Sequence, residues 1–327
     1  MSRNALIVHG GGLVDPSKDV LLRIGKNLYE SQLFDKIFIG RYSFESFYTP
    51  EFMMDYSLFL DKNLKDKRGT YFGTCRGINL TNETLLNKAL CCLKEREIDV
   101  IIVAGGDGSS RQVAEIHDSF LKEGIIIVFA IPLTIDGING SDSIGLKQAT
   151  RESVRQIENI VSTSLMTRDE EKFSVVAVEL QGRNRDDIMS EVLFTFMLKE
   201  QIADISLSDL LLRVVPANIK SDEKKLIDEI NSSSKPTLIL VSEGAKIKIP
   251  NLTKKITRKV RTLIVGHPSQ SNNMTTEEDI REYNIWIDTA CKYILKNLDH
   301  SYGLVMRNNI IWEVPIDYYA VLNPKEK

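Results

Sequence analysis

A run of glycine, aspartate and serine at residues 105–109 has the composition of a phosphate-binding loop. It stands between an apolar run, residues 100–104, and a helical pattern. A helix that begins there presents backbone N–H groups and the positive end of its dipole, which favour a phosphate, and glycine allows close approach. Asp107 repels a phosphate by itself, but its carboxylate can hold the Mg²⁺ that bridges phosphate oxygens. The alternative is a glycine turn in which Asp107 or Ser109 only caps the helix.

Two further polar loops follow apolar runs in the same way. Asp136 comes shortly after the run at residues 125–131, next to Thr134. A carboxylate there can accept the proton of an attacking hydroxyl in phosphoryl transfer, although an aspartate after a strand is also a common turn residue. Gly10, Gly11 and Gly12 follow the first apolar run. The three loops together predict a phosphate site with a nearby base.

The elements that must position these loops alternate between two kinds. Short β-branched runs, typical of strands buried on both faces, lie at residues 5–8, 36–40, 100–104, 125–131, 174–178, 210–215, 237–241 and 262–265. Amphipathic stretches, typical of helices, lie at residues 81–96, 109–122, 145–161 and 276–298. This alternation predicts mostly parallel sheets with right-handed crossovers. In such sheets the carboxyl ends of the strands share one rim, so the polar loops converge there.

The overall composition is that of an ordinary globular chain. It has 327 residues, 43% of them hydrophobic and 27% charged, and a formal net charge of −3. This length suffices for two domains, and the charge argues against a whole-protein basic field for nucleic acid. The cysteines have no paired spacing and the first apolar run is too short for a membrane span, so we expect a cytoplasmic protein with reduced thiols and no membrane partner.

The motifs and their order resemble the phosphofructokinase family, and the resemblance runs from about Ala5 to Val314. Besides the glycine loops at residues 10–12 and 105–109, the matching segments are Gly69-Thr70-Tyr71-Phe72-Gly73-Thr74-Cys75-Arg76, Pro132-Leu133-Thr134-Ile135-Asp136, Gly140-Ser141-Asp142, Val178-Glu179-Leu180-Gln181-Gly182-Arg183, Ser242-Glu243-Gly244 and Val265-Gly266-His267. Order and spacing together make this match more specific than any single motif.

The resemblance implies a role for each matched residue. Asp136 is the catalytic base, with Thr134 beside it, and Asp107 is the Mg²⁺ ligand. The nucleotide is held by Gly10, Gly11, Gly12, Arg76, Gly106, Gly108 and Ser109. The acceptor is held by Gln181, Arg183, Glu243, His267 and Gln270. Glycine at position 108 is typical of members that use ATP, whereas many pyrophosphate users carry aspartate there, so ATP is the expected donor.

The departures from the family pattern concern the acceptor side and the loop after Asp136. Gln270 stands where the family has an arginine that grips the phosphate of fructose 6-phosphate. A charged contact is worth about 1.5–3 kcal/mol and a neutral one about 1 kcal/mol, so a normal fructose 6-phosphate site is not expected. The acidic residue expected two positions after Asp136 is replaced by Ile138. Phosphate-donor features are therefore kept and acceptor features are changed.

From these residues we predict the phosphofructokinase fold, with two Rossmann-like three-layer α/β/α domains and mostly parallel sheets. The nucleotide domain is expected at residues 1–145, continued by about 278–327, and the acceptor domain at 146–277. The predicted function is an ATP- and Mg²⁺-dependent kinase that phosphorylates a hydroxyl of a sugar, sugar phosphate or nucleoside. The alternative is a catalytically weak regulatory homologue that binds nucleotide. The family resemblance also implies a homodimer or homotetramer.

Overall fold

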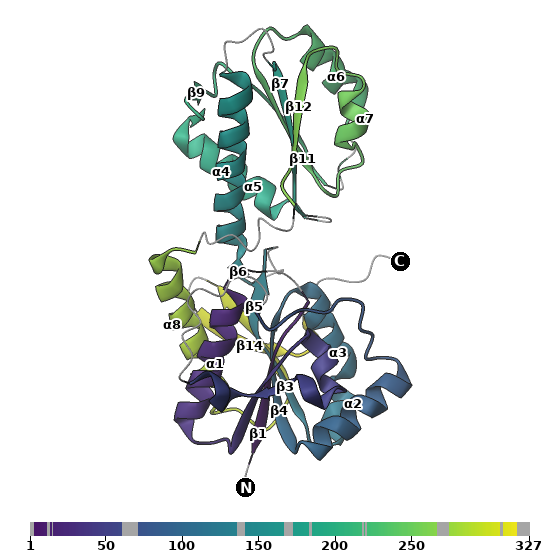
Figure 1. The fold of residues 1–327 in the computed structure, drawn as a ribbon, viewed down its shortest axis with the longest axis vertical. Helices are drawn as coiled ribbons and strands as arrows, with labels where there is room; N and C mark the ends of the chain where they lie inside the picture. The colour runs from purple at the N-terminus through teal and green to yellow at the C-terminus, as the bar shows by residue number, and fades with distance from the viewer. Residues whose placement is uncertain are drawn as a thin grey trace. The chain divides into compact units, whose positions relative to one another are not determined.

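A computed structural model describes residues 3–11, 14, 16–60, 71–135, 141–166, 173–182, 185–217, 219, 221–266, 275–307 and 310–318. The chain divides into two compact units. Unit 1 consists of Met1–Gly145 and Thr275–Lys327, and unit 2 of Leu146–Met274. Each unit is a layered α/β structure (Figure 1).

The sheet of unit 1 is mostly parallel. Its strands are β1 (Asn4–His9), β2 (Lys36–Gly40), β3 (Met53–Asp55), β4 (Ile98–Gly105), β5 (Ile126–Thr134), β6 (Ile144–Gly145), β13 (Tyr302–Arg307) and β14 (Ile310–Pro315). They lie in the order β14-β13-β5-β4-β1-β2-β3, with β6 paired to β5. Strand β1 pairs in parallel with β2 and with β4, and β4 pairs in parallel with β5. The edge strands β3 and β14 are antiparallel to their neighbours. The strand order reverses between β1 and β4, which is the switch point where ligands bind in open parallel sheets.

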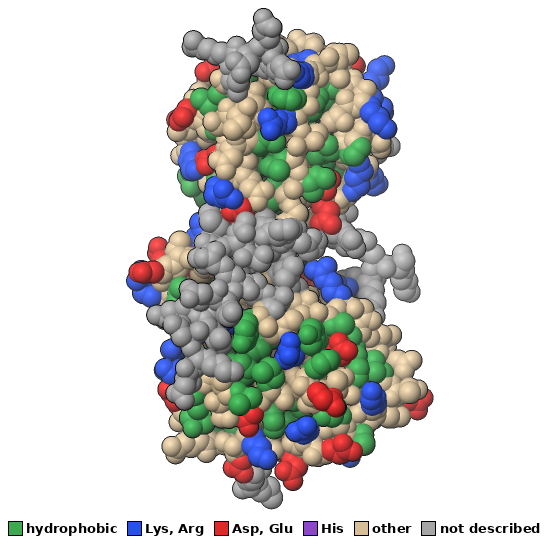
Figure 2. Space-filling model, in the orientation of Figure 1, with side chains coloured by type: hydrophobic (Ala, Val, Ile, Leu, Met, Phe, Trp, Pro, Cys, Tyr) green, Lys and Arg blue, Asp and Glu red, His purple; other side chains and the backbone are tan. Residues whose placement is uncertain are grey.

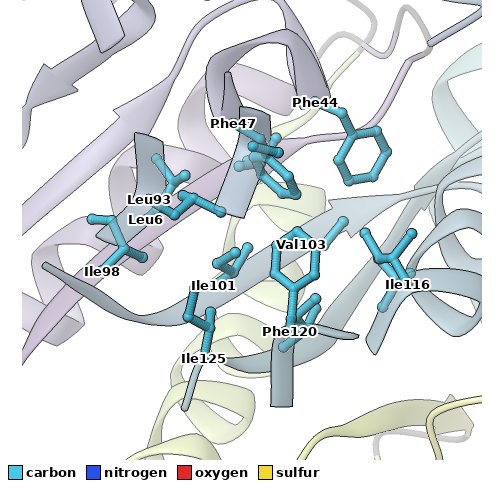
Figure 3. Packing of buried hydrophobic residues seen from close by; sticks show 14 of the residues in the cluster. Leu6, Phe44, Phe47, Leu93, Ile98, Ile101, Val103, Ile116, Phe120 and Ile125 are labelled. Atoms are coloured by element: carbon cyan, nitrogen blue, oxygen red, sulfur yellow. The ribbon is translucent and has the colours of Figure 1, made fainter. Parts of the chain in front are cut away.

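Helices cover both faces of this sheet (Figure 1). They are α1 (Ser17–Ser31), α2 (Glu83–Glu95), α3 (Asp107–Lys122) and α8 (Glu277–Ile294), and short 3₁₀ turns lie at Ser43–Phe47, Pro50–Phe52 and Tyr56–Phe59. Helices α1 and α8 pack together, and Arg23 donates to Asp288 across them at 2.8 Å. On the other face, α2 and α3 bury one apolar cluster against alternate strand residues, as Figure 3 shows for Leu6, Val103 and Phe120.

Unit 2 repeats the same layered plan on a smaller scale. Its strands β7 (Val175–Leu180), β10 (Leu211–Val215), β11 (Thr237–Ser242) and β12 (Val260–Ile264) are all parallel, in the order β10-β11-β7-β12. Its helices are α4 (Leu146–Leu165), α5 (Asp187–Lys199), α6 (Glu223–Ser232) and α7 (Ile249–Thr253), and a hairpin joins β8 (Gln201–Ile202) and β9 (Ile205–Ser206). Helices α6 and α7 bury an apolar cluster against β7 and β11.

The predicted α/β architecture with mostly parallel sheets is confirmed, with two local corrections. Helix α3 begins at Asp107, two residues before the predicted start, because the N–H groups of Ser109 and Ser110 both donate to the Gly106 carbonyl. Thr134 was predicted to lie in a loop, but it ends β5, since Leu133 and Thr134 pair with β6. Helix α1 and the β13–β14 pair were not predicted.

The surface of the described residues carries charges of both signs. On the face drawn in Figure 2, acidic and basic side chains are interspersed in each unit. Among the helices that the structure describes, none has the length and apolar character needed to cross a membrane.

Candidate active site

At the switch point of unit 1, the loops after β1 and β4 approach each other so closely that glycine is required. A Cβ on Gly10 would lie 1.7 Å from Ser109 Oγ, and a Cβ on Gly105 would lie 2.7 Å from the same atom. The Gly10 N–H also donates to the Ala104 carbonyl at 2.7 Å. These two glycines therefore bring the first loop against the start of α3, and Ser109 is buried between them.

The N-terminus of α3 lies at the centre of this arrangement. Gly106 is its N-cap residue and supplies no side-chain cap, and Asp107 is the first helical residue. A Cβ on Gly106 would lie 3.1 Å from Thr134 Oγ1, so the end of β5 is next to the loop. Among the described residues, no neighbouring atom lies within 4 Å of a Cβ built on Gly108. Backbone N–H groups at a helix start attract phosphate.

A cavity of about 340 Å³ opens at this helix start. Its lining residues are Gly11, Phe44, Cys75, Arg76, Gly77, Ile78, Gly108, Ser109 and Gln112. This volume lies within the range of about 300–1,000 Å³ that is usual for small-molecule sites. Its lining combines glycine backbone, the cationic residue Arg76 and the apolar residues Phe44 and Ile78, so it offers contacts both for an anionic group and for an apolar ring.

His9 ends β1 next to this cavity's glycine loop, but it brings no charge to it. Only 3% of the residue is exposed, and its Nε2 atom has no hydrogen-bond partner within the described ranges of the chain. Burial lowers the pKa of His9 from 6.5 to about 4 because the protonated imidazole loses its hydration. The imidazole is therefore neutral at pH 7, and Arg76 is the cation among the residues that line the cavity.

The corresponding strand ends of unit 2 carry charged side chains. Glu243 follows β11, and its Oε2 atom accepts from the Gly182 N–H at 3.4 Å. Lys248 donates to the Glu243 carbonyl oxygen. The pKa of the Glu179 carboxyl group is raised, mainly by partial burial, while Lys248 lowers it and Glu243 raises it. Two carboxylates and an ammonium group therefore lie near one another at this edge.

Comparison with known proteins decides the family. The family model for phosphofructokinase matches residues 6–287. This chain belongs to the phosphofructokinase family. An ATP-dependent 6-phosphofructokinase of Staphylococcus epidermidis is 26% identical over 254 residues, which cover 76% of this chain and 73% of the relative.

Solved phosphofructokinases share the fold. The pyrophosphate-dependent phosphofructokinase of Marinobacter aquaeolei superposes with a TM-score of 0.77 at 15% identity, covering 97% of this chain and 84% of that chain. The phosphofructokinase of Saccharomyces cerevisiae gives a TM-score of 0.75 at 17% identity, covering 98% of this chain and 45% of the yeast chain. The phosphofructokinase fold predicted from the motifs is thus confirmed.

Within this phosphofructokinase fold, the predicted donor-side residues gather at one place. Those that the structure describes are Gly10, Gly11, Arg76, Gly106, Asp107, Gly108, Ser109 and Thr134, all in unit 1. The described acceptor-side residues, Gln181 and Glu243, follow neighbouring strands of unit 2. Gly12, Asp136, Arg183, His267 and Gln270 lie outside the described residues. The roles of all these residues stay predictions.

The structure also adds residues that the motifs did not indicate. In unit 1, Phe44 and Gln112 line the cavity. In unit 2, Lys248 contacts Glu243. Phe44 belongs to a 3₁₀ turn after β2, and Gln112 lies one helical turn after Gly108. Gln112 follows Gly108 by four residues in a predicted helix, and residues at this spacing share a helix face. This spacing indicates that Gln112 lies near the loop. No local pattern indicated Phe44 or Lys248.

Proposed function

We propose that this protein is an ATP- and Mg²⁺-dependent kinase that transfers the γ-phosphate to a hydroxyl group of a sugar, sugar phosphate or nucleoside. The observation that carries this proposal is the cavity at the switch point of unit 1, where Gly11, Arg76 and Gly108 meet at the start of α3. A triphosphate placed there would meet helix N–H groups and a guanidinium. The family's phosphoryl transfer to an alcohol fits this arrangement, because the protein mainly positions and neutralises charge.

The described residues fit a Mg²⁺ ion. Asp107 puts one carboxylate in the first turn of α3, directly before two residues that line the cavity. Mg²⁺ bound with a nucleotide usually takes one or two protein carboxylates and fills its other positions with phosphate oxygens and water. The ion would neutralise the charge of the phosphates, and Asp107 would hold the ion in position. Thr134 and the predicted base Asp136 would complete the reacting centre.

The acceptor is proposed to bind at the strand ends of unit 2 that carry Gln181 and Glu243, together with Arg183, His267 and Gln270. Carboxylates such as Glu243 accept hydrogen bonds from sugar hydroxyls, and an amide can both donate and accept. With glutamine in place of the family arginine at position 270, one charged contact to an acceptor phosphate is lost. The proposed acceptor therefore differs from fructose 6-phosphate in structure or in pose.

The experiment is a comparison of kcat/KM across sugars, sugar phosphates and nucleosides, with ATP and pyrophosphate as alternative donors. We expect ATP to be the better donor and another acceptor to exceed fructose 6-phosphate by about tenfold to a few hundredfold, at 1.4 kcal/mol per tenfold. Fructose 6-phosphate turnover at about 10⁴ M⁻¹s⁻¹ or more would instead identify an ordinary phosphofructokinase activity. Faster transfer from pyrophosphate would reverse the donor assignment.

The second candidate is a regulatory homologue that binds nucleotide without efficient turnover. It is favoured by the replacement of the phosphate-gripping arginine by Gln270. ATP binding with no phosphorylation of any acceptor would support it. For either candidate we propose a homodimer or homotetramer, as the family resemblance implies, and a cytoplasmic location, which the four free cysteines Cys75, Cys91, Cys92 and Cys291 support.

A further inference from the structure

The side-chain amide of Gln112 is held in one orientation at the wall of the unit 1 cavity. Its Nε2 atom donates to the backbone carbonyl of Ile78 at 2.8 Å. A carbonyl oxygen only accepts hydrogen bonds, so the amide must turn its NH₂ group towards Ile78. Flipping the amide would bring two acceptor oxygens together. The carbonyl oxygen of Gln112, Oε1, therefore has a set direction.

The remaining hydrogen-bonding groups of this amide are one acceptor and one donor. Among the residues that the structure describes, the Gln112 side chain makes the single bond to Ile78. Some side-chain atoms are fully buried without a hydrogen-bond partner, but Oε1 of Gln112 does not belong to them. Gln112 lines the cavity. An occupant of the cavity can thus donate to Oε1 and accept from the second N–H of Nε2.

Gln112 lies one helical turn from the start of α3, where the phosphates are proposed to bind. Gln112 follows Gly108 by one turn of α3, so the two residues share a helix face and lie about 6 Å apart along the axis. The apolar residues Phe44 and Ile78 line the same cavity. If the phosphates lie at the helix start, the base of a nucleotide reaches the region of Gln112, where the apolar side chains can contact its ring.

We propose that Gln112 makes the cavity selective for a 6-aminopurine over a 6-oxopurine. Adenine offers a 6-amino donor next to a ring-nitrogen acceptor, which matches Oε1 and the second N–H; glutamine pairs with adenine in this way in nucleic-acid recognition. Guanine and hypoxanthine present an oxygen at position 6, which would face Oε1 as a second acceptor. This inference rests on the proposed nucleotide site and specifies which base it takes.

The test is calorimetric binding of Mg·ATP and Mg·ITP to the wild-type protein and to Gln112→Met, which keeps the chain length but loses both polar groups. We expect the wild type to bind ATP about tenfold more tightly than ITP, the gain of one neutral hydrogen bond over an opposed pair. In Gln112→Met the ratio should fall to within about twofold. Loss of the bond to Ile78 weakens both ligands alike, so a purely structural role leaves the ratio unchanged.

Each other outcome has a distinct meaning. Equal binding of ATP and ITP by the wild type, or an unchanged ratio in Gln112→Met, overturns the role of Gln112 while the nucleotide site stands. Binding of neither ligand overturns the nucleotide site and this inference with it.

A second measurement applies if Gln112→Met does not fold. The affinities of the wild type for ATP and ITP are then compared with its affinity for purine riboside triphosphate, which lacks a substituent at position 6. The expected order of affinity is ATP, then the unsubstituted purine, then ITP, because the purine only loses a bond whereas ITP adds an opposed acceptor. Equal affinities for the three overturn the proposal.

Discussion

The strand ends of the two units form their candidate sites by different means. In unit 1 the site depends on backbone approach: Gly10 lies against Ser109, and the nearby histidine is neutral. In unit 2 the corresponding ends carry charged side chains, Glu179, Glu243 and Lys248. The same parallel-sheet architecture therefore supports one edge made of glycine and helix N–H groups and another made of side-chain charge.

This difference predicts that the proposed donor side is the more constrained of the two. Replacing Gly10 would require Ser109 to move, so substitution there affects the fold as well as the site. Replacing Glu243 changes charge without a comparable steric conflict. Under the proposed roles, a chain can therefore change its acceptor and keep its nucleotide loop. Four predictions test this contrast, in order of decreasing effect.

The largest effect is expected for Asp107→Ala. Removing the proposed Mg²⁺ ligand at the start of α3 should lower kcat/KM for phosphoryl transfer by about a thousandfold, equivalent to roughly 4 kcal/mol, because charge on the phosphates is no longer neutralised in place. Transfer is measured at saturating Mg²⁺. The control is Asp118→Ala, which removes an exposed carboxylate from the same helix. Equal rates for the two variants would exclude a metal role for Asp107.

The neutral His9 predicts an acid-sensitive unit 1. Its pKa is lowered to about 4 in the folded chain, so the unfolded chain binds the extra proton between pH 6.5 and 4. Stability is therefore present above pH 6.5 and should decrease by about 3 kcal/mol as the pH falls to 4. Both tryptophans, Trp286 and Trp312, belong to unit 1, so urea unfolding followed by fluorescence reports it. His9→Leu should show a smaller decrease; an identical pH profile would contradict the assignment.

Gly10→Ala should destabilise unit 1 by about 2 kcal/mol, since the new methyl group would stand 1.7 Å from Ser109 Oγ and force a shift. The matched control is Gly108→Ala, where a Cβ meets no atom of the described part of the chain within 4 Å. Unfolding is followed by tryptophan fluorescence, as above. If both variants are equally stable, the close approach of the two loops is not what requires glycine at position 10.

The smallest effect is expected on the acceptor side. Glu243→Gln keeps the shape but removes the charge, so the KM for the best acceptor should rise about tenfold, near 1.4 kcal/mol, with ATP affinity unchanged. The variant should also lower the pKa of Glu179, because the Glu243 charge raises it. The control is Glu223→Gln, which removes the charge of a half-buried glutamate that is paired with Lys255. A change in ATP affinity without a change in acceptor KM would refute this division of roles.

Sequence alone predicted the features that depend on local patterns. Buried strands are continuous apolar runs, and the glycine loop at residues 105–109 is contiguous, so both were found. Helix α1 was missed although Val20, Ile24 and Leu28 have helical spacing and are buried. Its N-cap residue, Pro16, provides no side-chain hydrogen bond, so a usual signal for the start of a helix was missing.

The remaining features depend on segments that are distant in sequence. Ile78 and Gln112 are 34 positions apart and meet only in the folded unit. Likewise, β13 pairs with β5 through Tyr302 and Val128, a contact that no periodicity encodes. Lys248 contacts Glu243 from an irregular segment after β11. Local pattern therefore identifies the loops, and tertiary packing decides which other side chains line the site.

The pairing of β5 with β13 has a consequence for synthesis on the ribosome. Unit 2 is one continuous segment, whereas unit 1 is interrupted by it and is completed by Thr275–Lys327. Until Tyr302 and Gly303 have emerged, β5 can pair with β4 at Val128 and Phe129, but the edge that β13 covers stays open. An open edge of this kind pairs readily with other chains. β5 ends at Thr134 and β13 begins at Tyr302, so about half of the chain is synthesised while this edge is open to pairing with other chains.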